Sequence, residues 1–391
     1  MFFGDDPRRA LLYGFAVYAV GFLTRPLGGI IIGHYADTRG RKPAMRLCLA
    51  GAGVAALGMA LTPTAAAVGL AAPLLVLFWR ALLGFFYGGE APLGHGYVYE
   101  MTTPERRGSA GSMLPTASGL GVVLVNVLVL ALVAGFGPDR VVGGYWRIPF
   151  LLGAFASFGF AVLRGGLSES SEFESRRDGD AYSWWSARRE LAGPMLTVAG
   201  VTVGMTAVHH LWSALPAAYG ISVLRLNDTA VLTASTAAAL TGTIAVPLCG
   251  RLGDRVGCRR MLCWAAVALA VTIVPLQYLL QHSGVAGFRI VVVLAAALLA
   301  PLTAVAPSVL AGLVPARYRV SAEALPYTTA VTVFGGTVPL LARLTSAAPL
   351  VFGGYIVALL LVTVTTLRHL GRRSAVEAEA PATAAVSGAR R

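Results

Sequence analysis

Charged residues are scarce in this chain of 391 residues, because Asp, Glu, Lys and Arg make up only 13% of it. A soluble domain normally carries about 25%. The chain is 56% hydrophobic with a mean hydropathy of +0.71, and its apolar residues run in long blocks. These properties exclude a soluble enzyme, a disordered chain and a nucleic-acid-binding domain. They predict an all-α, polytopic membrane protein whose surroundings are a lipid bilayer.

Cysteine is also rare, and the four cysteines show neither CxxC pairs nor metal-ligand spacing. We therefore predict no disulfide and no metal site. The sequence has no P-loop, no Rossmann fingerprint and no nucleophile–base pattern, so no cofactor and no enzymatic activity are expected. An imposed ion gradient is then the expected energy source.

Eleven segments are long and apolar enough to be candidate membrane spans, by the criterion of about 20 residues for about 30 Å of hydrocarbon, applied loosely. The predicted spans are Ala10–Gly33, Leu47–Leu61, Ala71–Ala91, Met113–Phe136, Ile148–Leu163, Pro194–Pro216, Ala230–Gly250, Met261–Leu280, Ile290–Leu313, Leu325–Ala342 and Pro349–Leu367.

The basic residues predict the orientation of these spans. The net charge is +13, and alternate loops together with the C-terminal tail hold 22 basic residues against seven on the other side. Basic residues collect in cytoplasmic loops, so this charge does not imply a nucleic-acid partner. We predict a multi-pass protein of the inner or plasma membrane with a cytoplasmic C-terminus. Eleven spans then place Met1 outside, although residues 1–9 contain no secretory signal.

One long polar segment, Gly165–Glu190, interrupts the hydrophobic pattern. We interpret residues 165–190 as a cytoplasmic linker between a five-span bundle, residues 1–164, and a six-span bundle, residues 191–373. Residues 374–391 are rich in Ala, Glu and Pro and are predicted to be a disordered cytoplasmic tail.

Two predicted cytoplasmic loops repeat one pattern, in which Gly, three residues, Asp, two residues and Gly precede clustered bases. The first is GHYADTRGRK from Gly33 and the second is GRLGDRVGCRR from Gly250, 217 residues later. Such a repeat indicates duplicated bundles. Two spans precede the second loop but only one precedes the first, so the symmetry predicts that one N-terminal helix is absent.

These loops resemble the signature G-x-L-x-D-R-x-G-R-R/K of the major facilitator superfamily. The segments GFLTRPLGG from Gly21, RALLGFFYGGE from Arg80, WRIPF from Trp146 and SESSEF from Ser168 are similar to its metabolite:proton symporter family. The resemblance covers essentially the whole chain. It implies two pseudo-symmetric helical bundles and proton-coupled symport of a small organic anion or zwitterion by alternating access. A monomer is favoured.

Arg25, Arg80 and Glu90 are candidates for substrate binding or proton coupling. An ionisable side chain inside a span is costly unless it is paired or faces water, and two arginines favour a carboxylate ligand. A buried ion pair is the structural alternative. Gly84 and Gly88, four residues apart, predict the close approach of another helix.

His209, His210 and Trp212 lie within one predicted span and could line the same cavity. Histidine titrates near neutrality and suits proton transfer, although a hydrogen bond to a neighbouring helix explains either ring equally well. A tryptophan at this place could instead anchor the helix at the membrane interface.

A second group of residues is predicted to form a cytoplasmic gate, in which Asp37 pairs with bases of the neighbouring bundle. In the superfamily such a charge cluster closes the cytoplasmic side of the outward-open state. The alternative is a solvated loop that only fixes topology. The predicted gate residues are Gly33, Asp37, Gly40, Arg41, Glu100, Asp254 and Arg255.

A second function remains open at the level of sequence. The absent helix is compatible with a truncated relative that no longer transports and has a sensing or partner-binding role.

Overall fold

The computed structural model describes residues 17, 19–174, 187–213, 215–222, 224–282, 284–344 and 349–388. These residues form helices joined by short turns, with no strand among them. The N-terminal bundle comprises α2 (Arg25–Arg39), α3 (Arg41–Leu61), α4 (Ala65–Val68), α5 (Ala71–Glu100), α6 (Arg107–Phe136), α7 (Pro138–Arg140) and α8 (Arg147–Leu163), with η1 (Pro104–Arg106), η2 (Val141–Tyr145) and η3 (Arg164–Gly166) between them.

After the short α9 (Ser171–Glu174), the C-terminal bundle begins. It comprises α10 (Arg188–Ser213), α11 (Leu215–Ser222), α12 (Asp228–Val256), α13 (Cys258–His282), α14 (Gly284–Gly312), α15 (Arg319–Ala330), α16 (Val338–Leu344) and α17 (Pro349–Gly388), with η4 (Ala316–Tyr318) and η5 (Val331–Gly335) flanking α15.

Ten helical segments of the described residues are long and apolar enough to cross a membrane. Each overlaps one of the last ten predicted spans. The first predicted span, Ala10–Gly33, lies partly outside the described residues, and α2 contains its second half. The prediction that Met1 is external also falls outside them. The chain is therefore a multi-pass α-helical membrane protein, as its composition predicts.

Several helices extend further than their apolar cores. The helix α5 continues from Ala91 to Glu100, and α15 begins at Arg319 rather than at Leu325. Polar side chains in these extensions bind one another, so their helical turns need no apolar environment. The helix α17 also continues to Gly388, through the segment in which the sequence predicts disorder. Alanine and glutamate, frequent in that segment, favour helix without packing.

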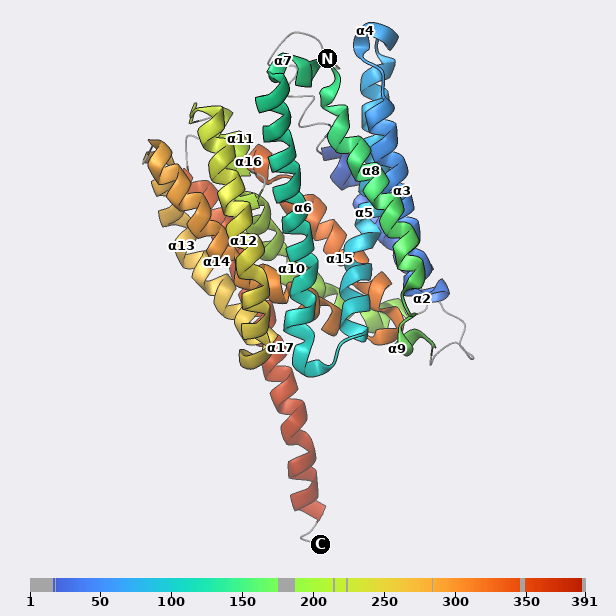
Figure 1. The fold of residues 1–391 in the computed structure, drawn as a ribbon. Coiled ribbons are helices and arrows are strands. Elements are labelled where there is room, and N and C mark those ends of the chain that lie inside the picture. Colours follow the sequence, from blue (N-terminus) through green and yellow to red (C-terminus); the bar gives the residue numbers. More distant parts are fainter. Residues whose placement is uncertain are drawn as a thin grey trace.

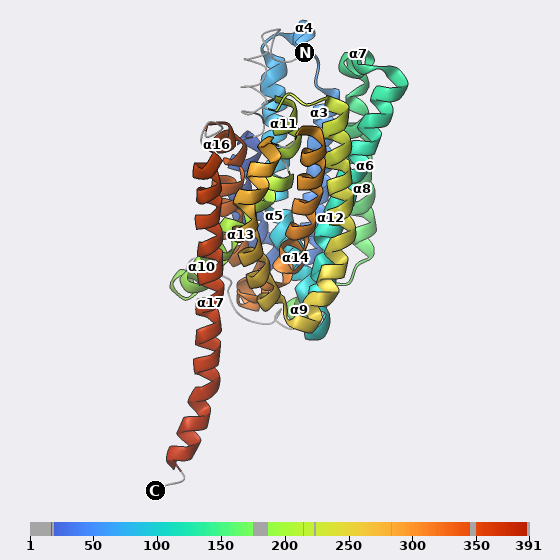
Figure 2. The same cartoon turned by 90° about the vertical axis from the view of Figure 1, so that its left-hand side faces the viewer.

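Some helix pairs recur in both halves, within the two bundles that Figures 1 and 2 show. Within the N-terminal bundle α2 lies on α5, and α3 contacts both α5 and α8. Within the C-terminal bundle α12 lies on α14, and α17 contacts α10 and α13. Two further pairs join the bundles, because α2 packs against α15 and α6 packs against α12.

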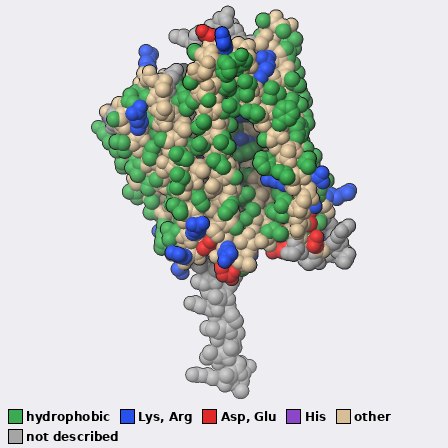
Figure 3. Space-filling model, in the orientation of Figure 1, with side chains coloured by type: hydrophobic (Ala, Val, Ile, Leu, Met, Phe, Trp, Pro, Cys, Tyr) green, Lys and Arg blue, Asp and Glu red, His purple; other side chains and the backbone are tan. Residues whose placement is uncertain are grey.

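The surface has the distribution expected of a protein in lipid. Large apolar side chains are exposed along the helices, among them Leu120, Phe155 and Val271. Figure 3 shows them covering the middle of the molecule, while most of the charged side chains gather near its two ends. We call the end that carries Gly40 and Gly257 the motif end.

Candidate functional site

Both repeated loops end a helix in the same way. Gly40 follows α2 with φ of +112°, and Gly257 follows α12 with φ of +97°. Residues with side chains rarely adopt such angles. Each glycine donates its backbone N–H to the carbonyl four residues earlier, Ala36 and Gly253 respectively. The shared spacing of Asp and Gly in the two motifs therefore places each aspartate within the last turn of its helix.

Asp37 uses this position to bind the other bundle. Its carboxylate accepts the backbone N–H groups of Val320 and Ser321, at 3.3 and 2.8 Å, and the Ser321 hydroxyl at 2.5 Å. These residues are the second and third of α15. The first backbone N–H groups of a helix have no partner within it and carry partial positive charge, so a carboxylate there is stabilising.

Asp254 makes the equivalent contact in the opposite direction. Its two carboxylate oxygens accept the N–H groups of Gly108, at 2.6 Å, and Ser109, at 3.0 Å. These are the second and third residues of α6. Each bundle therefore supplies one aspartate that binds the start of a helix in the other bundle.

Buried charges reinforce the contact at Asp37. Arg41 binds Asp37 at 2.8 Å and Glu100 at 3.0 Å, with only 2% of its side chain exposed. Glu100 is also bound, at 2.8 Å, by Arg319 of α15. Arg319, the basic residue of the C-terminal bundle at this contact, thus binds Glu100. The sequence instead predicts that a basic residue of the neighbouring bundle pairs with Asp37. Asp37 instead uses the backbone of α15, which sequence does not reveal.

The segment after α8 adds to this cluster. Glu169 accepts the backbone N–H groups of Arg41 and Lys42, at 2.9 and 3.1 Å, and its carboxylate would meet any side chain at Gly40. Ser170 donates its hydroxyl to Glu100 at 2.5 Å, and Glu172 of α9 binds Arg319 at 2.7 Å. The start of the predicted linker therefore belongs to the contact between the bundles.

Of the other predicted gate residues, Gly33 lies against the backbone of Ser321, so α2 and α15 approach closely there. Arg255 is exposed, one residue beyond Asp254. Sequence reasoning missed Arg319, which it counted among the bases that fix orientation. The sequence does contain a second repeat that could have identified Arg319. Arg-Gly-Ser-Ala from Arg107 and Arg-Val-Ser-Ala from Arg319 begin the two helices that the aspartates bind.

A second buried pair joins the bundles one turn further into α15. His95 of α5 and Glu323 of α15 lie 2.6 Å apart, from Nδ1 to Oε1, with 11% and 0% of their side chains exposed. Sequence reasoning missed both residues because the predicted spans end at Ala91 and begin at Leu325.

Arg25 lies at the start of α2 among aromatic rings. Its guanidinium carbon is 3.8 Å from the ring centre of Phe22 and 4.7 Å from that of Tyr87. Phe22 in turn meets His210 of the C-terminal bundle, with ring centres 5.5 Å apart. The arginine is therefore held by cation–π contacts near the junction of the two bundles.

Arg80 and Glu90 lie apart on α5. The half-buried Arg80 packs beside Gly21, whereas Glu90 lies 4.0 Å from Arg164 at the end of α8, with 29% of its side chain exposed. Glu90 thus has a basic neighbour within its own bundle. The predicted close approach at Gly84 and Gly88 is confirmed, since the backbones of Gly21 and Arg25 contact them.

The three candidates on α10 have different surroundings. His210 is held by the Thr206 carbonyl, 2.8 Å from its Nδ1, and its ring meets that of His209 at 5.4 Å between centres. Trp212 is buried in the apolar core of the C-terminal bundle. His210 therefore contacts the N-terminal bundle, through Phe22.

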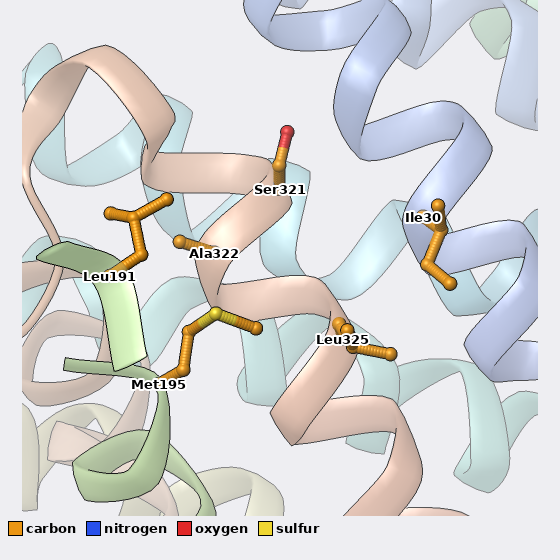
Figure 4. A pocket seen from close by; sticks show the side chains of 6 residues that line it. All are labelled: Ile30, Leu191, Met195, Ser321, Ala322 and Leu325. Carbon is orange, nitrogen blue, oxygen red and sulfur yellow. The ribbon is translucent and has the colours of Figure 1, made fainter. Parts of the chain in front are cut away.

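A small apolar pocket lies beside the contact at Asp37 (Figure 4). It is lined by Ile30, Leu191, Met195, Ser321, Ala322 and Leu325. Its one side-chain hydroxyl, that of Ser321, already binds Asp37. This pocket is therefore unsuited to an anionic ligand.

Figure 3 shows a separate hollow between α6 and α8, with basic side chains within it and at its rim. In the described part of the chain, no group of three or more His, Cys, Asp or Glu side chains is placed to hold a metal ion.

Two helical bundles that meet through paired polar contacts at one end define a two-bundle membrane transporter. The chain belongs to the Major Facilitator Superfamily, because residues 9–217 match the sequence profile of that family. It is a secondary transporter of that superfamily, and a small molecule is its substrate.

Relatives and solved structures agree with this assignment. The citrate-proton symporter of Klebsiella pneumoniae is 31% identical over 337 residues, which are 85% of this chain and 76% of the relative. The ectoine/proline transporter ProP of Corynebacterium glutamicum is 30% identical over 363 residues, which are 85% of this chain and 69% of the relative. The proton:xylose symporter XylE superimposes with a TM-score of 0.74 at 15% identity, covering 94% of this chain and 87% of that one. This last likeness concerns the fold alone.

Proposed function

We propose that the protein is a proton-coupled symporter that moves a small organic anion or zwitterion by alternating access. The two moving bodies are the bundles of residues 1–164 and 191–373, joined by the linker of residues 165–190. The observation that carries this proposal is the pair of equivalent contacts made by Asp37 and Asp254. Both are polar and local, so they can break and re-form without loss of the apolar packing inside either bundle.

The motif end is the cytoplasmic gate in this proposal. It holds most of the basic residues of the loops, which favour the cytoplasm, and this orientation also places the C-terminus there. The closed contact then corresponds to a state open to the outside. Gly33, Gly40, Arg41 and Glu100 hold Asp37 in place, and Arg255 adds charge beside Asp254. We place the protein in the inner or plasma membrane as a monomer.

A carboxylate is the substrate group that the site suits best. Arg25 lies near the junction of the bundles against aromatic faces, and a planar, charged guanidinium suits bidentate recognition of a carboxylate. Arg80 lies close by, beside Gly21. His209, His210 and Trp212 of α10 are candidates for the facing side of the cavity, and Glu90 is a further candidate for proton coupling.

Two of the relatives are named for citrate with protons and for ectoine and proline, and both names fit this substrate class. The alternative, a relative without transport, is less well supported because each half binds the other through its motif aspartate.

The test is uptake by the full-length protein in proteoliposomes, with radiolabelled citrate and proline as separate probes. An inward proton gradient should accelerate uptake of at least one probe, and a protonophore should abolish the acceleration. Vesicles that contain the Arg25→Ala protein serve as the control for specific binding. Uptake that is absent, or indifferent to the gradient, for a panel of carboxylates and betaines would contradict the proposal.

A further inference from the structure

The contact between the bundles contains one buried acid that the gate does not use. Glu323 lies one turn beyond Arg319 on α15, and its side chain is fully buried. One carboxylate oxygen meets His95 of α5 at 2.6 Å, and the other, Oε2, has no hydrogen-bond partner among the described residues. A buried carboxylate with one free oxygen is costly as an anion unless it gains a proton or a cationic partner.

The partner that is present can supply a proton. At 2.6 Å, the Nδ1 of His95 and the carboxylate of Glu323 can share one proton. The pair has no net charge with that proton, whether the ring or the acid carries it. Without the proton, a carboxylate charge remains between the two bundles, where its second oxygen is unsatisfied.

The surroundings do not replace this proton. On α15 itself, the charge of Arg319 acts on Glu323, but its guanidinium is bound to Glu100 and Glu172. Tyr327 meets His95 edge to face, with ring centres 5.7 Å apart. From α2, Arg25 lies against the rings of Phe22 and Tyr87, and Asp37 is engaged at the start of α15. From α5, Tyr87 acts on Tyr327. From α10, Arg189 and Glu190 are exposed, and α14 has only the exposed Arg289 as a charged residue.

We propose that His95 and Glu323 form the proton-binding site of the transporter, in which one proton is held between the bundles while the motif end is closed. This inference rests on the proposed function and names the residues that carry the proton. The proton arrives on the partly exposed ring of His95 and is shared with Glu323. When α5 and α15 separate, both groups become hydrated and the proton leaves to water.

The site therefore couples protonation to bundle separation. Closing the motif end requires the shared proton, because closing without it buries a bare carboxylate. A rise in pH should consequently favour the separated state. Since one proton is involved, each pH unit changes the ratio of closed to separated molecules by up to about tenfold.

The experiment measures that ratio without a substrate. Spin labels are placed on the exposed Arg39 and Arg260, one in each bundle at the motif end, after the four native cysteines are replaced by alanine. Pulsed electron spin resonance then gives the distance distribution in proteoliposomes between about pH 5 and about pH 9. We expect the long-distance population to grow with pH in the otherwise native protein.

Four variants make the result specific. Glu323→Gln mimics the protonated acid and should remain closed, with less than about twofold change across the range. Glu323→Asp keeps a carboxylate and should keep the pH dependence. Glu105→Gln removes a fully exposed acid near the same end and should reproduce the native profile. His95→Gln is a second probe of the pair and should displace the midpoint of the profile.

The inference is overturned if the distances do not depend on pH in the native protein, or if Glu323→Gln and His95→Gln both keep the native profile. Its failure is distinguishable from failure of the proposed function. Gradient-driven uptake of citrate or proline, measured on the same samples, tests the symport, whereas the distance profile tests the pair in the absence of either probe.

Discussion

Asp37 and Asp254 occupy equivalent positions, and each binds the second and third backbone N–H groups of a helix in the opposite bundle. Their difference is in the side chains around them. Asp37 also binds Arg41, which is buried and continues the network to Glu100. The duplicated architecture thus has one contact with an ion-pair network and one that depends mainly on backbone groups.

Replacement of Asp37 by asparagine should open the motif end. The variant loses the negative charge that the start of α15 and Arg41 both bind. A hydrogen bond to a charged group contributes about 1.5–3 kcal/mol, so the ratio of closed to open molecules should fall by roughly tenfold or more. The distance between labels on Arg39 and Arg260 measures this population. Asp139→Asn, at an exposed position on α7, is the control, and unchanged distances in Asp37→Asn would show that the loop only fixes topology.

Replacement of Asp254 by asparagine should act in the same direction but less strongly. The amide still offers one oxygen to Gly108 or Ser109, and no buried arginine loses its partner. We expect the free-energy difference between the closed and open states to change by about 1 kcal/mol, which is about fivefold in the ratio of closed to open molecules. A shift larger than that of Asp37→Asn would contradict the assignment of the ion-pair network to the first contact.

Replacement of Gly88 by alanine should impair assembly of the N-terminal bundle. A methyl group there would lie 2.2 Å from the backbone oxygen of Arg25, so α2 must move away from α5. Overpacking of this kind costs about 1–3 kcal/mol. Gly94 on the same helix is the matched control, because its methyl group would meet only the Leu114 side chain, at 3.5 Å. Thermal unfolding in detergent should separate the two variants, and equal stability would contradict the packing account.

Replacement of Arg80 tests the basic residue that lies beside Gly21. Arg80→Lys keeps the charge but loses the planar fork, so it should retain partial uptake, and Arg80→Ala should retain almost none. Loss of a desolvated charge pair costs on the order of 2–5 kcal/mol, or tens- to thousands-fold in affinity. Uptake is measured per correctly inserted molecule, with the exposed Arg289→Ala as control. A well-inserted Arg80→Ala protein with native uptake would remove Arg80 from the site.

Much of the fold follows from the sequence because lipid imposes strong rules. Long apolar runs predict ten of the helices that the structure describes, and the repeated Gly and Asp pattern predicts duplicated bundles. The pattern contains Asp37 and Arg41, and the resemblance to the superfamily added Glu100; the structure brings the three together. Composition and periodicity are sufficient for the spans and the repeat, since each of these features is local in the chain.

The pairs between bundles could not be predicted in this way. His95 and Glu323 are 228 positions apart, and each lies beyond the end of an apolar run. Their burial depends on the packing of α5 against α15, which hydropathy does not report. The bonds from Asp37 to Val320 and Ser321 use backbone N–H groups, which are common to all residues and leave no mark in the sequence.

In the proposed mechanism, the protein couples proton entry to solute entry. The most direct measurement is the pH change in lightly buffered proteoliposomes when citrate or proline is added outside, in the absence of any imposed gradient. We expect alkalinisation outside that depends on the probe and is reduced by at least about tenfold in Glu323→Gln. Solute uptake without proton movement in the native protein would contradict it.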